Sequence, residues 1–79
     1  MLRDYIDLLF FLKRNVDPMS GNAIARKKKM FNTTVQSRLE ELERVGLVEK
    51  VYHSSHMTLW TISYNGKAVL ELLTILDEI

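Results

Sequence analysis

Four consecutive basic residues, Arg26 to Lys29, carry the clearest chemistry in this sequence. Two apolar residues and then several hydrogen-bonding side chains follow them directly, in the stretch ARKKKMFNTT. Between Gly21 and Leu39 there are five basic residues and no acid, although the formal net charge of the 79-residue chain is only +1. The positive charge is therefore local, which is typical of a surface that binds a polyanion.

The four basic side chains cannot all face one ligand if they lie on a helix. Consecutive helical residues are separated by about 100°, so four of them spread over about 300°. Lysines at the end of a helix also complement its dipole and raise the local positive field. We expect Arg26, Lys27 and Lys29 to supply phosphate contacts, and the alternative is a solvated charged surface without a partner.

Composition restricts the class of protein. The chain has no cysteine, which argues against a disulfide-stapled secreted domain, and its hydrophobic content of 47% is too high for a disordered chain. No apolar run is long enough to span a bilayer. We therefore expect one small cytoplasmic domain, and a domain of this size often gains support from oligomerisation.

The sequence lacks the residues that catalysis and metal binding require. The sequence shows no glycine-rich phosphate loop, no nucleophile beside a base and no paired carboxylates in a context that would form a cleft. The two histidines, His53 and His56, cannot complete a zinc site without further ligands. We expect no enzymatic activity, no metal, no cofactor and no small-molecule ligand.

Apolar periodicity and turn residues predict a single domain of four helices and one hairpin. Val35, Leu39 and Leu42 recur at helical spacing, and the residues around Tyr52 and Trp60 favour extended structure. The predicted elements are a first helix at 1–16, a second at 20–29, a third at 33–45, a hairpin at 47–62 and a last helix at 64–78.

Local residue types mark the ends of these helices. Ser20 and Ser63 are suited to cap the second and last helices at their N-termini. Thr33 and Gln36 have the spacing of a capping box at the start of the third helix, and Gly46 is suited to end it.

This order of elements resembles the winged helix–turn–helix family of DNA-binding regulators, particularly MarR-like, PadR-like and small archaeal or archaeal-virus members. Three motifs carry the resemblance, which covers nearly the whole chain: AIA in the second helix, TTVQSRLEELERVGLVEK over the third helix and first wing strand, and LWTISYNGKAVLELL over the second wing strand and last helix. It implies an α+β, mainly α fold with three helices, a two-stranded wing and a C-terminal helix. It also implies sequence-specific double-stranded DNA binding as a transcriptional regulator, and so an association with the nucleoid.

The turn between the second and third helices departs from the family pattern. Lys28 stands where the family usually has a buried leucine, and Lys29 where it usually has glycine. Met30 or Phe31 is then expected to take the core position, while the Lys28 stem lies along apolar surface with its amine in water.

The resemblance implies that the N-terminal half of the third helix enters the major groove. Gln36 has the chemistry to bond adenine, Thr34 to offer its methyl group to thymine, and Arg38 to bond guanine or a phosphate. The alternative for Thr33 is that its hydroxyl only caps the third helix, because capping uses the same atoms as a base contact. The residues expected to read bases are Thr33, Thr34, Gln36, Ser37 and Arg38.

The wing and the terminal helices complete the expected site. Lys50, Ser54, Ser55 and His56 are expected to donate to phosphates from the wing, and Trp60 to pack in the core. The apolar arc of the last helix is wider than one core contact needs, and Phe11 is expected to project outward from the first helix. These features predict a homodimer that sets two recognition helices about 34 Å apart. Its expected interface is Leu2, Tyr5, Phe11, Leu72, Leu73, Leu76 and Ile79.

Two alternatives remain open from the sequence. The wide apolar arc of the last helix could also belong entirely to the core of a small domain, without a dimer interface. A winged helix can also serve as a protein–protein interaction module without binding DNA. The basic second helix and the threonine- and glutamine-containing face of the third favour DNA.

Overall fold

The computed structural model describes residues 2–54 and 57–78, with only the backbone of His53. Four helices and three strands form the fold, which confirms the predicted α+β, mainly helical class. Their order is α1 (Leu2–Arg14), β1 (Met19–Ser20), α2 (Gly21–Lys28), α3 (Asn32–Arg44), β2 (Val48–His53), β3 (Thr58–Ile62) and α4 (Tyr64–Glu78).

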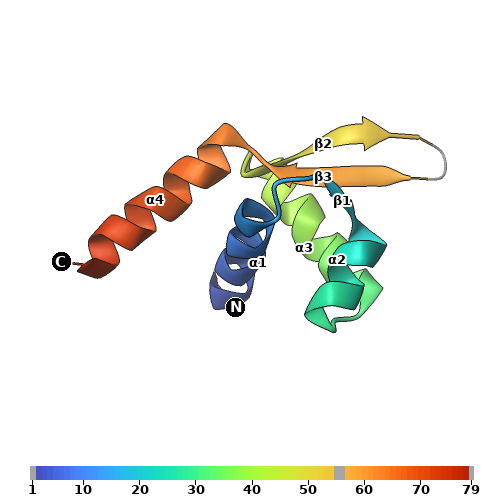
Figure 1. Ribbon diagram of the computed structural model, residues 1–79, viewed down its shortest axis with the longest axis horizontal. Helices are drawn as coiled ribbons and strands as arrows, with labels where there is room; N and C mark the ends of the chain where they lie inside the picture. The colour runs from blue at the N-terminus through green and yellow to red at the C-terminus, as the bar shows by residue number, and fades with distance from the viewer. Residues whose placement is uncertain (1, 55–56, 79) are drawn as a thin grey trace.

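The sheet forms one layer, and α1, α2 and α3 pack together beneath it (Figure 1). Helix α4 leaves the end of β3 and points away from this body, in the direction opposite to the β2–β3 hairpin. The molecule is accordingly elongated, with extents of 44 × 23 × 21 Å. One end of the molecule is thus the wing, and the other is a protruding helix.

The antiparallel sheet has the strand order β1–β3–β2. The predicted β2–β3 hairpin is present, with an irregularity between Lys50 and Tyr52 that leaves Val51 outside the register. Strand β1 was not predicted: it is only two residues long, and Met19 pairs with Trp60 from across the chain. A two-residue strand is too short to show an alternating pattern, so its pairing is imposed by β3.

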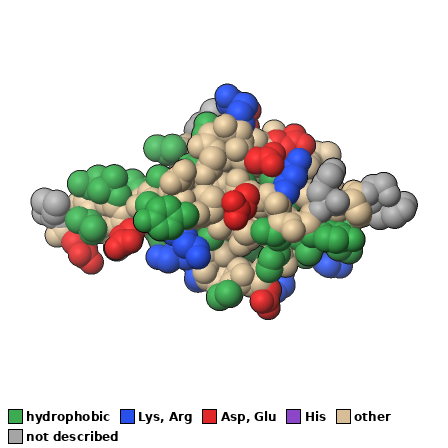
Figure 2. Space-filling model, turned by 90° about the horizontal axis from the view of Figure 1, so that it is seen from above, with side chains coloured by type: hydrophobic (Ala, Val, Ile, Leu, Met, Phe, Trp, Pro, Cys, Tyr) green, Lys and Arg blue, Asp and Glu red, His purple; other side chains and the backbone are tan. Residues whose placement is uncertain are grey.

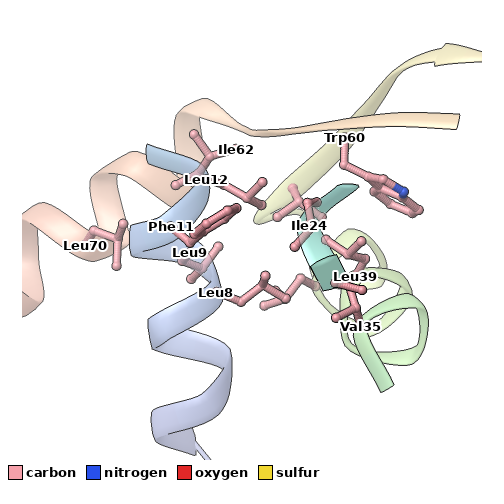
Figure 3. Packing of buried hydrophobic residues seen from close by; sticks show 13 residues of the cluster. Leu8, Leu9, Phe11, Leu12, Ile24, Val35, Leu39, Trp60, Ile62 and Leu70 are labelled. Carbon is pink, nitrogen blue, oxygen red and sulfur yellow. The ribbon is translucent and has the colours of Figure 1, made fainter. Parts of the chain in front are cut away.

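The core contains residues from all four helices and from strands β2 and β3 (Figure 3). Trp60 from β3 points toward α2 and α3, where it meets a group that includes Ile24, Val35 and Leu39, and all four side chains are fully buried. The third helix buries Val35, Leu39 and Leu42, as its spacing predicts. Packing of this apolar group fixes α3 against α2, which sets the geometry of the candidate site.

Phe11 lies in this core, so the prediction that it projects outward toward a dimer partner is wrong. Its side chain is 9% exposed, and it packs in the same cluster as Leu8, Leu12 and Leu70. Helix α1 packs against both β3 and α4, so more than one of its faces is covered by the rest of the protein. The face that carries Leu2 remains open instead, with that side chain exposed.

Three of the predicted helix ends are as expected, and one is wrong. Ser20 caps α2 by accepting from the Ala23 N–H at 3.2 Å, and Gly46 ends α3 with φ +82°. Helix α3, however, begins at Asn32, with Phe31 at the cap position and no side-chain cap. Thr33 therefore lies inside the first turn, and the predicted capping box does not form.

Ser63 ties the start of α4 to the end of α3. Its hydroxyl accepts from the Gly66 N–H at 3.0 Å and donates to the Gly46 carbonyl at 2.7 Å, and the residue is buried. Ser63→Ala removes both bonds and leaves the partly buried Gly46 carbonyl without this donor. We expect a loss of about 1–2 kcal/mol in the free energy of unfolding, measured by urea denaturation. An unchanged midpoint would contradict this role, and Ser37→Ala, an exposed serine on α3, serves as the control.

Candidate nucleic-acid interface

The turn between α2 and α3 is built on a left-handed lysine. Lys29 has φ 55° and ψ 49°, and the N–H of Met30 bonds back to the Ala25 carbonyl at 2.9 Å. Glycine usually fills this position, because a side chain there costs about 1–2 kcal/mol. The chain therefore keeps a cation at the turn at some cost in backbone strain.

The core position that the sequence left open is taken by Met30. Its side chain is partly buried and packs against the core, whereas Phe31 is 82% exposed. The Lys28 ammonium lies 5.2 Å from the centre of the Phe11 ring, in a cation–π contact. Lys28 thus turns toward the protein, while Arg26, Lys27 and Lys29 remain exposed.

The polar residues of α3 divide into an exposed face and its two flanks, as the spacing predicts. Thr34, Gln36, Arg38 and Glu43 are partly buried, and the exposed residues are Asn32, Thr33, Ser37, Glu40, Glu41 and Arg44. Glu41 accepts a 2.6 Å bond from Arg44, which raises the pKa of that guanidinium. The acidic half of α3 is therefore its C-terminal half, which the field of DNA phosphates would repel.

Two of the predicted base-reading residues have partners within the protein. Arg38 lies 3.4 Å from a carboxylate oxygen of Asp4 on α1, and the Gln36 amide donates to Glu40 at 3.1 Å. Gln36 also leans over the start of α2, since a Cβ on Gly21 would lie 3.1 Å from its side-chain oxygen. Both side chains would have to exchange these partners in order to reach a base.

The described wing residues also have partners within the protein, on α3 and on the hairpin itself. The Lys50 ammonium lies 3.6 Å from a carboxylate oxygen of Glu43 and 5.4 Å from the centre of the Trp60 ring. The Ser54 hydroxyl accepts from the Met57 N–H at 3.1 Å and so helps to close the turn. The predicted phosphate contacts Ser55 and His56 lie outside the described residues.

A second surface lies at the opposite side of the domain, where α1, α4 and the end of α3 enclose an apolar groove of about 350 Å³. Its lining includes Leu2, Tyr5 and Leu73 of the predicted dimer interface. Leu72 and Leu76 are each 56% exposed on α4, and Figure 2 shows hydrophobic side chains gathered along this protruding helix. Ile79 lies outside the described residues. We call this surface, formed by the groove and the exposed leucines of α4, the terminal-helix face.

The described part of the chain holds neither a metal-ligand cluster nor a membrane-spanning helix. No three histidine, cysteine, aspartate or glutamate side chains converge there in a way that could hold a metal ion. None of the described helices has the length and apolar character needed to cross a membrane.

Helix α2, the tight turn, α3 and the β2–β3 hairpin together define a winged helix–turn–helix domain. No protein-family model matches the sequence, and no curated protein matches it either. Solved structures match the fold closely, and these neighbours are MarR-family winged-helix transcription regulators. The resemblance inferred from the motifs is thereby confirmed at the level of the fold.

Three neighbours illustrate the match. The complex of MepR with DNA from Staphylococcus aureus has a TM-score of 0.81 at 23% identity, covering 96% of this chain and 57% of its own. A probable transcriptional regulator from Pseudomonas aeruginosa has a TM-score of 0.79 at 25% identity, covering 95% and 58%. An E41A mutant of Lactococcus lactis ZitR has a TM-score of 0.73 at 18% identity, covering 94% and 51%. The chain thus spans little more than half the length of these regulators.

Proposed function

We propose that this protein binds double-stranded DNA sequence-specifically, as a homodimeric transcriptional regulator. The observation that carries the proposal is the junction of α2 and α3, where exposed cations stand directly beside the polar first turns of the helix that would enter the groove. No acid interrupts this surface along the chain until Glu40. MepR, a neighbour with the same fold, has been solved in complex with DNA.

Within this proposal, the residues fall into two groups. Arg26, Lys27 and Lys29 hold the phosphate backbone, because they are exposed cations at the end of α2 and in the turn. Thr33 and Ser37 are exposed on the groove-facing side of α3 and reach base edges directly. Thr34, Gln36 and Arg38 join them from the flanks, with Gln36 and Arg38 leaving their partners Glu40 and Asp4.

The homodimer is proposed to form through the terminal-helix face. We expect a second copy of the chain to bind this face. In an isologous pair, the exposed leucines of each α4 would lie against the groove of the other copy. Among the described residues that line the groove, Glu41 is the only charged one. The same pairing would present two recognition helices to one side of a duplex, as an inverted repeat requires.

The terminal-helix face also favours a second candidate, a protein-interaction module. In that case the exposed apolar residues of α4 would bind a different protein, and DNA affinity would be absent. The affinity of the purified protein for duplex DNA distinguishes these two candidate functions.

Selection from a random duplex library, followed by gel shift, tests DNA binding. We expect an enriched pair of inverted half-sites about one helical turn apart. We also expect affinity to fall steeply with salt, by a log–log slope of about −0.9 for each phosphate contact. Binding without any enriched half-site, or a slope near zero, would contradict the proposal.

Lys27→Ala and Gln36→Ala should separate anchoring from reading. Lys27→Ala should weaken binding to all sequences alike and make the salt slope shallower by about 0.9. Gln36→Ala should cost about 1–3 kcal/mol and relax the preference at one base position. Lys67→Ala, which removes an exposed lysine from α4, is the control for a general loss of charge. If the two test variants behave alike, the division between the two groups is wrong.

A further inference from the structure

Phe31 is a large aromatic side chain whose exposure neither folding nor helix capping explains. It is 82% exposed, and its neighbour Met30 supplies the core contact of the turn. Phe31 occupies the N-cap position of α3, where a short polar residue would normally bond the first turn, and it makes no such bond. An exposed phenylalanine in a position that favours serine or aspartate indicates a role outside the folded domain.

The surroundings of Phe31 are polar and cationic. Its exposed neighbours along the chain are Lys29, Asn32 and Thr33. The other strongly exposed apolar side chains lie on other parts of the fold: Val16 between α1 and β1, Tyr52 and Met57 on the wing, Tyr64 at the start of α4, and the residues of the terminal-helix face. A protein-binding patch consists of several neighbouring apolar residues, which Phe31 does not have among the described residues. A single aromatic ring among cations and hydroxyls is instead suited to the major groove of DNA. There the thymine methyl is an apolar group that lies among phosphates and polar base edges.

The backbone places this side chain at the N-terminal end of α3, the end that the proposed binding mode turns toward the bases. Residues at the N-terminus of a recognition helix contact bases, and Phe31 directly precedes the first helical residue of α3. Its extended conformation, with φ −69° and ψ 138°, places it at the tip of the helix beside the residues of the first turn. The ring is therefore presented at the same end of α3 as the hydroxyl of Thr33.

We propose that Phe31 packs against the 5-methyl group of a thymine in the major groove and selects thymine at that base position. This inference rests on the proposed DNA binding, and it adds a specificity-determining residue that forms no hydrogen bond. The position read by Phe31 should lie next to the bases contacted by Thr33 and Ser37.

Replacing thymine by deoxyuridine removes only the methyl group, so it tests this contact directly. Each thymine of the selected duplex is replaced in turn, and Kd is measured for wild type and for Phe31→Ala. At one position per half-site, wild type should bind the uracil duplex about fourfold more weakly, which is the value of one buried methyl group. Phe31→Ala should bind the original duplex on the order of tenfold more weakly and lose nothing further on that replacement.

Tyr64→Ala is the matched control, because Tyr64 is an 84% exposed aromatic on α4. It should retain the wild-type affinity and the wild-type uracil penalty. Thermal unfolding of Phe31→Ala should equal that of wild type, since the ring is exposed.

The outcomes separate the inference from the function on which it rests. If Phe31→Ala keeps the wild-type affinity, or keeps the same penalty at every uracil, Phe31 does not read a methyl group and the inference is overturned while DNA binding stands. The same follows if wild type binds all uracil duplexes equally. If wild type binds no duplex at all, the proposed function itself fails.

Discussion

Gly66→Ala should destabilise the domain by about 3 kcal/mol, although alanine normally favours a helix by about 1 kcal/mol over glycine. Gly66 is buried in the first turn of α4. A Cβ at this position would collide with the carbonyl oxygen of Leu47 and lie 2.6 Å from Cγ1 of Ile62. The carbonyl cannot easily move, because it accepts the Ser63 N–H at 3.0 Å. Fluorescence of the single tryptophan, Trp60, reports unfolding, and the Tm should fall by at least about 12 °C.

Gly46→Ala is the control for the general effect of replacing a glycine. Gly46 has φ +82°, but a Cβ there meets nothing within 4 Å. Its substitution should therefore cost only the strain of a left-handed residue, about 1–2 kcal/mol. If Gly46→Ala costs more than Gly66→Ala, or if Gly66→Ala is neutral, the close approach of α4 to the end of α3 is not a determinant of stability.

Features that depend on a few neighbouring residues could be predicted from the sequence. Ser20, Ser63 and Gly46 mark helix ends through bonds to groups close along the chain or through a single backbone angle. The buried stripe of α3 follows in the same way from a repeat of Val35, Leu39 and Leu42. The fold class follows from these signals because each one is local and all of them agree.

Features that depend on packing between distant elements could not be predicted. Phe11 falls on the polar side of α1 in the sequence, yet it is buried because α1 is enclosed by both β3 and α4. The capping box failed because the N-cap of α3 is Phe31, two residues before Thr33. A shift of two residues is enough to move a hydroxyl from the cap position into the helix.

The candidate site shows the same division. Helical spacing correctly distinguishes the exposed Ser37 from the flanking Gln36 and Arg38. The bond from Arg38 to Asp4 joins residues 34 positions apart, and no local pattern predicts it. The exposure of Phe31 was likewise open, because either Met30 or Phe31 could satisfy the core.

Leu72→Gln combined with Leu76→Gln should convert the proposed homodimer to a monomer. Both leucines are more than half exposed on α4, so the isolated domain loses little packing when they become polar. Glutamine is a good helix former and adds no charge, so neither the stability of α4 nor the attraction to phosphates should change. Sedimentation of the double variant should show a species of about 9.2 kDa, the mass of one chain.

The effect on DNA binding should be larger than for any single contact. In the proposed homodimer, binding of one half-site would hold the second recognition helix at a high effective concentration, which would raise affinity for an inverted repeat by about 10²–10⁴-fold. The double variant should lose about 100-fold or more on the inverted repeat and bind an isolated half-site as wild type does. Tyr64→Gln, on the first turn of α4, should change neither quantity. A double variant that remains dimeric would place the interface elsewhere, and a monomeric variant with undiminished affinity for the repeat would show that one domain is sufficient for recognition.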